Sequence, residues 1–329
     1  MSHQRSDSAG LVLGHGNFGN NLQFVGRFTE ARYHLERVHV LYDPTGHRSL
    51  VDQVGVYPQV TSRGLLAIVL FCLGYPDQGL AQNNAALAEA RRLAHLPSLA
   101  DGLGVTARLL SLLGDDAVLG ERADQLVAVA AEQGFPQWGA LGSIYRGWVR
   151  VKNGDVTEGI SLLHNGSVAY RATGAALGTP FLLALLAGAY EIVGQIEEAE
   201  ALVDEALQTV DRTGERWFTA ELNRHKGQLL LSQGDPEAAE ELYWKALSTA
   251  REQQAKMWEL RAAVSLAQLR RPEARELLVP VYGWFTEGFD TPDLKVAKAL
   301  LEELQPAARS GSRELPGSER RRQPTRSGT

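Results

Sequence analysis

The sequence has few of the residues that build chemical sites. Its single cysteine, Cys72, excludes an internal disulfide and a cysteine-based zinc site. Cys72 lies in an apolar run, which predicts a buried, unreactive thiol and fits a reducing cytoplasm. His34 and His39 are five residues apart, whereas a metal-binding pair on one helix face is spaced by four. We therefore expect no metal and no cofactor.

Motifs for nucleotide chemistry and hydrolysis are also missing. The chain contains no Gly-Lys pair, so it cannot form a P-loop, and it has no Gly-x-Ser-x-Gly nucleophile elbow. Gly14–Gly19 spells Gly-x-Gly-x-x-Gly, but the dinucleotide fingerprint needs a preceding strand, and nothing before Leu11 can supply one. We predict that these glycines belong to a helix and that the protein is not an enzyme.

Positive charge and long hydrophobic runs are scarce as well. The formal net charge is −6 and the isoelectric point is near 5.8, whereas duplex nucleic-acid binders usually carry a basic stripe. The longest apolar stretches, residues 64–73 and 180–190, are about ten residues long and too short to cross a bilayer. The polar residues 1–10 do not resemble an export signal. We expect neither nucleic acid nor a membrane as a partner.

Glycine is plentiful, and its spacing is regular. Steps of 40 residues back from Gly234 reach Gly194, Gly154, Gly114 and Gly74, and one longer step reaches Gly26. About 20 residues after each of these glycines comes a second candidate turn residue, in order Gly46, Ala94, Gly134, Gly174, Gly214 and, as the exception, Gln254. Apolar helical segments fill the intervals. Such a fixed period predicts an array of helix pairs with a repeat of about 40 residues.

The expected organisation is one elongated repeat domain at residues 11–304. Residues 1–10 are predicted to be a disordered N-terminus, and residues 305–329, rich in Arg, Ser, Gly and Pro, a disordered basic tail. The connection His47–Tyr57 accounts for the longer step. A seventh pair is shortened at Arg270-Arg271-Pro272, and a capping helix is expected to follow Thr291.

When the repeat units are aligned at their turn glycine, the positions of small residues predict how the two helices of each pair pack. Seven residues before that glycine, every side chain is small: Gly19, Ala67, Ala107, Gly147, Ala187 and Gly227. Five residues after it most are small as well: Ala31, Gly79, Leu119, Gly159, Ala199 and Ala239. Helix backbones approach closely only over small side chains, so we expect the two helices of each pair to cross here.

This pattern resembles the tetratricopeptide repeat. The sixth unit shows it in full, with Gly227, Gly234-Asp235, Ala239, Tyr243 and Ala246. Phrases such as Leu73-Gly74-Tyr75-Pro76-Asp77 and the segment Pro280–Thr291 also look like the C-terminal helical region of bacterial signalling proteins that carry an adenylate/guanylate cyclase domain, a P-loop ATPase domain or both. The resemblance covers residues 11–304 and none of those catalytic domains. It implies an all-α, tetratricopeptide-like superhelical solenoid of six to seven helix pairs.

The resemblance also implies a binding surface, because first helices line the concave groove of such arrays. By the family register, the positions six and ten residues before the turn glycine point into it. The candidate partner-binding residues are Asn20, Arg108, Ile144, Trp148, Arg224 and Gln228. Arginine and glutamine could hold a carboxylate or a peptide backbone, and tryptophan could anchor an interface. The alternative is that Trp148 packs between units and the arginines are solvated.

The implied function is that of a non-catalytic, cytoplasmic scaffold in bacterial signal transduction. Its partner would be a peptide or a protein domain, with the cyclase or ATPase domain of a signalling protein as one candidate. Two alternatives stay open: a domain that senses a small ligand, and an orphaned C-terminal fragment of a cyclase/ATPase signalling protein. A closed pocket with convergent polar groups would favour the ligand, and an open groove the partner. The sequence leaves the oligomeric state open.

Overall fold

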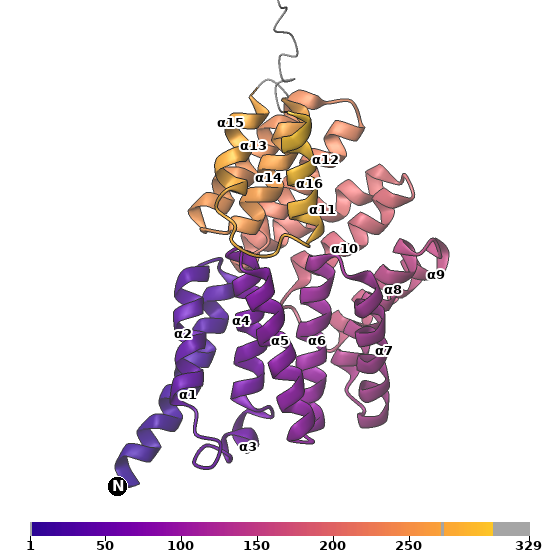
Figure 1. Cartoon of the computed structure of the whole chain (residues 1–329). Coiled ribbons are helices and arrows are strands. Elements are labelled where there is room, and N and C mark those ends of the chain that lie inside the picture. Colours follow the sequence, from indigo (N-terminus) through magenta and orange to yellow (C-terminus); the bar gives the residue numbers. More distant parts are fainter. Residues whose placement is uncertain (1, 271–272, 305–329) are drawn as a thin grey trace, which may run out of the picture.

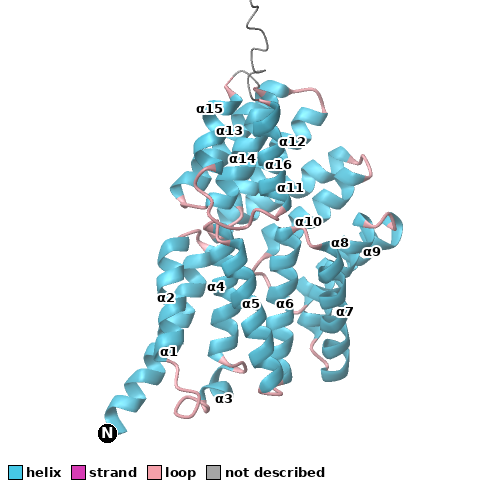
Figure 2. Ribbon diagram, viewed as in Figure 1, coloured by secondary structure: helices cyan, strands magenta, loops and turns pink. Residues whose placement is uncertain are grey.

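The computed structural model describes residues 2–270 and 273–304, and within these ranges the chain is helical with no strand (Figures 1 and 2). The helices are α1 (Ser2–Phe24), α2 (Phe28–Leu41), α3 (Leu50–Val54), α4 (Pro58–Cys72), α5 (Pro76–Arg92), α6 (Leu96–Leu113), α7 (Asp116–Gln133), α8 (Pro136–Lys152), α9 (Val156–Ala172), α10 (Thr179–Ile192), α11 (Ile196–Thr213), α12 (Thr219–Ser232), α13 (Pro236–Glu252), α14 (Lys256–Leu269), α15 (Ala274–Tyr282) and α16 (Pro292–Glu303).

The helices form seven consecutive pairs, α1/α2, α4/α5 and so on to α14/α15, so the fold is a tetratricopeptide-like α-solenoid as predicted. Helix α3 lies in the longer connection after the first pair, and α16 follows the seventh pair. Helix α1 begins at Ser2 rather than at Leu11. The predicted tail at residues 305–329 lies outside the described residues.

The predicted turn positions have the backbone conformation that favours glycine. All six turn glycines, from Gly26 to Gly234, have positive φ angles of 73–91°. Of the second turn positions, the later glycines also have positive φ, whereas Gly46 does not. Ala94 (φ 48°) and Gln254 (φ 55°) adopt the same left-handed conformation without being glycine. The repeat therefore imposes its geometry even where the sequence departs from the pattern, at a cost in backbone strain.

The predicted helix crossings are confirmed by the distances between backbones. A Cβ atom added to Gly147 on α8 would lie only 2.6 Å from the carbonyl oxygen of Gly159 on α9, and one added to Gly227 would lie 3.0 Å from the carbonyl oxygen of Ala239. The other crossing residues of the six pairs are buried too. Small residues at this register thus set the separation of the paired helices.

The array also doubles back on itself, which the repeat pattern does not predict. The backbone carbonyl of Phe24 accepts hydrogen bonds from the backbone N–H groups of Arg216 (2.7 Å) and Trp217 (3.1 Å). Asp77 accepts a hydrogen bond from the backbone N–H of Gly288 at 2.9 Å. Figure 1 shows helices α12–α16 seated over the ends of α2, α4 and α6. The first three pairs therefore contact the last two directly.

Helix α6 is the one described helix that is long and apolar enough to cross a membrane by length and composition. It lies inside the array, where 61% of its residues are buried against neighbouring helices. Packing between the third pair and its neighbours accounts for its apolar character.

Candidate functional site

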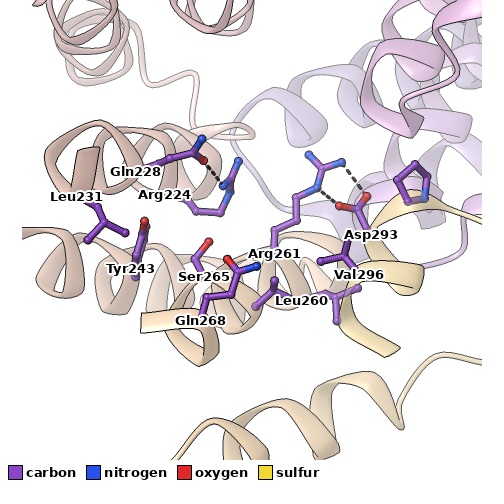
Figure 3. Close-up of a pocket in the computed structure, with 12 residues that line it drawn as sticks. Arg224, Gln228, Leu231, Tyr243, Leu260, Arg261, Ser265, Gln268, Asp293 and Val296 are labelled. Atoms are coloured by element: carbon purple, nitrogen blue, oxygen red, sulfur yellow. Dashed lines mark hydrogen bonds and ion pairs between the residues drawn. The ribbon is translucent and has the colours of Figure 1, made fainter. Parts of the chain in front are cut away.

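Two adjoining cavities lie on the inner side of the array, and together we call them the inner cleft. The larger cavity, of about 400 Å³, is shown in Figure 3. The smaller one has a volume of about 220 Å³. The two cavities share Arg224, Gln228 and Arg261, so they form one continuous depression.

The inner cleft is built mainly from first helices. Successive pairs contribute α6, α8, α10, α12 and α14, and α16 closes one side. On α12, Arg224, Gln228 and Leu231 follow the i, i+4, i+7 spacing that places side chains on one helix face. On α14, Arg261 and Gln268 follow the same spacing. The helical period of these two elements therefore aims their polar side chains into one space.

A buried ionic network crosses the larger cavity. The carboxylate of Glu221 accepts hydrogen bonds from Nε of Arg224 and from Nη1 of Arg261, both at 2.9 Å. Arg261 also donates to Asp293 at 2.8 and 2.9 Å. Burial alone would raise the pKa of Glu221, but the charges of Arg224 and Arg261 hold that pKa below its usual value. Glu221 is therefore ionised and held between the two guanidinium groups.

A second network connects α10 to α12. Nε2 of His225 lies 2.9 Å from Glu191, and the side-chain amide of Gln228 donates to the same carboxylate at 2.6 Å. Nη1 of Arg224 in turn donates to Oε1 of Gln228 at 3.2 Å. Burial opposes ionisation of Glu191, yet the His225 and Gln228 hydrogen bonds and the Arg224 charge lower its pKa. Gln228 thus bridges a cation and an anion.

Apolar side chains complete the inner cleft. Leu260, Val264 and Val296 line the larger cavity, and Phe181 and Phe218 line the smaller one. Its rim opens to solvent, because Leu231 is 38% exposed and Val296 is 47% exposed. An open cleft with apolar walls and fixed donors and acceptors is suited to binding rather than to bond making.

Three of the six predicted binding residues come together in the inner cleft. Trp148, Arg224 and Gln228 all line the smaller cavity, although they come from α8 and α12. Trp148 also packs between pairs, since a Cβ atom at Gly188 would lie 3.3 Å from its ring. Trp148 is therefore half-buried between units and also faces the cleft, and its role in binding a partner stays a prediction.

The other three predicted residues lie elsewhere. Asn20 lines a separate cavity of about 180 Å³ between α1 and α4. Ile144 has no exposed surface and packs against α9 in the core, so it does not face a groove. The guanidinium of Arg108 lies over the rings of Phe24 and Trp217, 5.9 Å from each centroid. The doubling back of the array carries Trp217 onto Arg108, which sequence periodicity cannot reveal.

Sequence reasoning missed the charged centre of the cleft. Glu221 lies one helical turn before Arg224 on α12, and Arg261 occupies the equivalent position of the seventh pair, on α14. Residues one turn apart share a helix face, so this position faces the same way as the candidate position at Arg224. Extending the register by one turn would have found both residues. Asp293, on α16 outside the repeat, carries no such signal.

The alternative chemical sites are also placed by the structure. Gly14–Gly19 lies inside α1, with Gly19 buried at the crossing with α2. Cys72 is fully buried, and burial raises the pKa of its thiol. Among residues 2–270 and 273–304, no group of three or more His, Cys, Asp or Glu side chains has a metal-binding arrangement.

Comparisons with known proteins agree with the fold. A tetratricopeptide repeat family model matches residues 180–252, which correspond to α10–α13. The chain is 25% identical over 212 residues to an uncharacterised protein of Rhizobium meliloti (strain 1021), covering 64% of this chain and 21% of that protein. The chain thus spans about a fifth of that relative's length.

The fold is shared with a solved structure. The crystal structure of the apo form of RapI superposes with a TM-score of 0.50 and 9% identity, covering 88% of this chain and 95% of that one. A STAND signal-transduction ATPase with a tetratricopeptide repeat sensor, from Pyrococcus horikoshii, gives a TM-score of 0.44 and 14% identity over 84% of this chain and 41% of that one. At 9% identity the likeness to RapI shows the fold alone.

Proposed function

We propose that the protein is a non-catalytic scaffold that holds a peptide or a segment of a partner protein in the inner cleft. The observation that carries the proposal is that the first helices of five successive pairs supply side chains to one continuous, open cleft. A surface assembled from successive repeats is extended along the array, as an extended segment of a partner requires.

The chemistry of the inner cleft supports a peptide as the occupant. The Gln228 amide can exchange its internal hydrogen bonds for bonds to a peptide backbone, and Arg224 can turn to a carboxylate. Trp148, Leu231 and Val296 offer apolar contacts for side chains beside these polar groups. The sequence resemblance makes a domain of a bacterial signalling protein, such as a cyclase or an ATPase, the candidate partner in the cytoplasm.

The proposal is tested by site-specific photo-crosslinking. A photoreactive amino acid replaces Leu231, which is 38% exposed on the rim of the cleft. The control carries it at Val168, which is 48% exposed on α9, a second helix. We expect a protein in bacterial lysate to be crosslinked from position 231 and not from position 168. Identical protein sets from the two positions would contradict a partner site in the cleft.

Cleft variants identify the contacts. Arg224→Ala with Gln228→Ala should weaken capture at position 231 at least about tenfold, because a charge-assisted hydrogen bond contributes about 1.5–3 kcal/mol. Arg171→Ala, which removes an exposed pair with Glu205 on the opposite helix layer, is the matched control and should leave capture unchanged. If native mass spectrometry instead finds a small molecule in the cleft and no protein is crosslinked, the ligand-sensing alternative replaces this proposal.

A further inference from the structure

A further cavity lies on the outer side of the array, between the first two pairs. This cavity, of about 500 Å³, is the outer pocket, lined by His39, Tyr42, Gln59, Arg63, Glu89 and Arg92 together with small apolar residues. It is lined by α2 and α5, the second helices of their pairs, and by α4, the first helix of the second pair, which carries Gln59 and Arg63. A neighbouring cavity of about 310 Å³ shares His39 and Arg63 and extends it.

The outer pocket coincides with the one irregular spacing of the array. The step from Gly26 to Gly74 is longer than every other step between turn glycines, and the additional residues form the connection that contains α3. Tyr42 and Pro44, at the start of this connection, form one wall of the pocket. The longer connection therefore supplies a wall here that the regular helix and turn of the other units do not provide.

One positive charge in this region lacks an acidic partner. Arg32 pairs with Glu36 at 2.7 Å, and Arg92 pairs with Glu89 at 2.7 Å. Arg63 hydrogen-bonds only the neutral side chain of Gln82, at 2.7 Å, and no carboxylate of the described residues lies within ion-pair distance of it. Glu89 interacts with the charge of Arg63 from beyond ion-pair distance and is itself paired with Arg92, so the half-buried guanidinium of Arg63 has no ion-pair partner in the outer pocket.

Two buried polar atoms beside Arg63 also lack partners within the described structure. They are Nε2 of His39 and Oε1 of Gln59. The amide nitrogen of Gln59 is used, since it donates to Glu89 at 2.5 Å, so its oxygen is the acceptor left over. Burial and the charge of Arg63 lower the pKa of His39 to about 4, which keeps the imidazole neutral at physiological pH. The pocket therefore offers one cation and at least one unused acceptor.

We propose that the outer pocket binds a small carboxylic acid that also carries a hydrogen-bond donor, such as a hydroxy acid or an amino acid. The carboxylate lies on the planar fork of Arg63, which matches it in geometry and charge. The hydroxyl or ammonium group of the ligand donates to Gln59. The ring of Tyr42 and the methyl groups of Ala85 and Ala88 contact the ligand's carbon skeleton.

Binding is measured with the full chain and three probes: lactate, alanine and propionate, each as a sodium salt or zwitterion at constant ionic strength. We expect lactate or alanine to raise the melting temperature saturably, by at least about 2 °C. The same additions should shift the NMR signal of the His39 ring, assigned through His39→Gln. Propionate, which carries the carboxylate without the donor, should bind at least about fivefold more weakly.

Two variants localise the site. Arg63→Gln should weaken the binding at least about tenfold, while Arg171→Gln, an exposed arginine on α9, should leave it unchanged. Ala88→Phe fills the pocket from an exposed position on α5 and should abolish binding without unfolding the chain, which keeps the test decisive if Arg63→Gln is unstable.

The proposal is overturned if neither lactate nor alanine shifts the His39 signal at about 10 mM, or if both pocket variants bind as the unchanged protein does. Equal binding of propionate and lactate would overturn the role assigned to Gln59.

Discussion

Arg261 on α14 donates a hydrogen bond of 2.7 Å to the backbone carbonyl of Leu112, a residue 149 positions earlier at the end of α6. The same guanidinium pairs with Glu221 and Asp293 and lies over the rings of Phe71 and Trp258. Through this one side chain the second, third, sixth and seventh pairs and α16 are joined.

Arg261→Gln should therefore destabilise the whole array. Removing the Arg261 charge leaves Asp293 without its cation and Glu221 with Arg224 alone, and we expect the free energy of unfolding to fall by about 3 kcal/mol. Urea denaturation followed by circular dichroism measures the loss. Arg146→Gln, which breaks an exposed pair with Asp124, is the control and should change stability by less than about 1 kcal/mol. Equal effects of the two variants would refute the joining role of Arg261.

Gly227→Ala should separate α12 from α13. The added methyl group would lie 2.7 Å from the ring of Tyr243 and 3.0 Å from the carbonyl oxygen of Ala239, and overpacking of this kind costs about 1–3 kcal/mol. Gly139→Ala on α8 is the matched control, because its methyl group meets only ordinary contact at 3.6 Å. There the helix preference of alanine should leave stability equal or slightly higher. Thermal unfolding of both variants checks the assignment, which a stable Gly227→Ala would contradict.

Ala94→Gly should stabilise the protein. Ala94 ends the second pair with a φ of 48°, a left-handed conformation that costs a non-glycine residue about 1–2 kcal/mol. Glycine avoids this strain but loses more chain entropy on folding, which cancels about 0.5–1 kcal/mol of the gain. We expect a net gain of about 0.5–1 kcal/mol in unfolding free energy. The same substitution within α5, Ala88→Gly, should instead lower stability by about 1 kcal/mol. A loss in both variants would show that the left-handed turn is not strained.

Lowering the pH should decrease the free energy of unfolding, because His39 is held neutral in the folded protein. Burial and Arg63 lower its pKa to about 4 in the folded protein, from 6.5 in the unfolded chain. Between these two values the unfolded state binds more protons, so stability falls as the pH decreases from neutrality. At about pH 5 this group alone should remove about 2 kcal/mol. His39→Gln should have a flatter profile between pH 5 and 7 in urea denaturation, and parallel profiles of the two proteins would contradict the assignment.

Much of the fold was predictable because local rules repeat. The glycine register predicts the turns at Gly74 and Gly234 and the crossing at Gly147, since each follows from backbone or packing constraints within one pair. The site was less predictable. The register implies a shared cleft for Trp148, Arg224 and Gln228, and the structure has one. Arg108 instead packs over Trp217, because distant pairs of the array contact each other. Such contacts depend on the curvature of the array, which accumulates over many repeats and leaves no periodic signal.

The contacts between the first three pairs and the last two also bear on how the chain folds. In a solenoid whose units touch only their neighbours, structure can spread from one unit to the next, and the units fray independently. Here the carbonyl of Phe24 accepts a hydrogen bond from Trp217, and the carbonyl of Leu112 accepts one from Arg261. Neither bond can form until these distant pairs come together. Contacts between distant pairs increase the average sequence separation of contacting residues, which slows folding. During synthesis, the surfaces of the first three pairs that contact the last two pairs therefore stay uncovered until the seventh pair and α16 have been made.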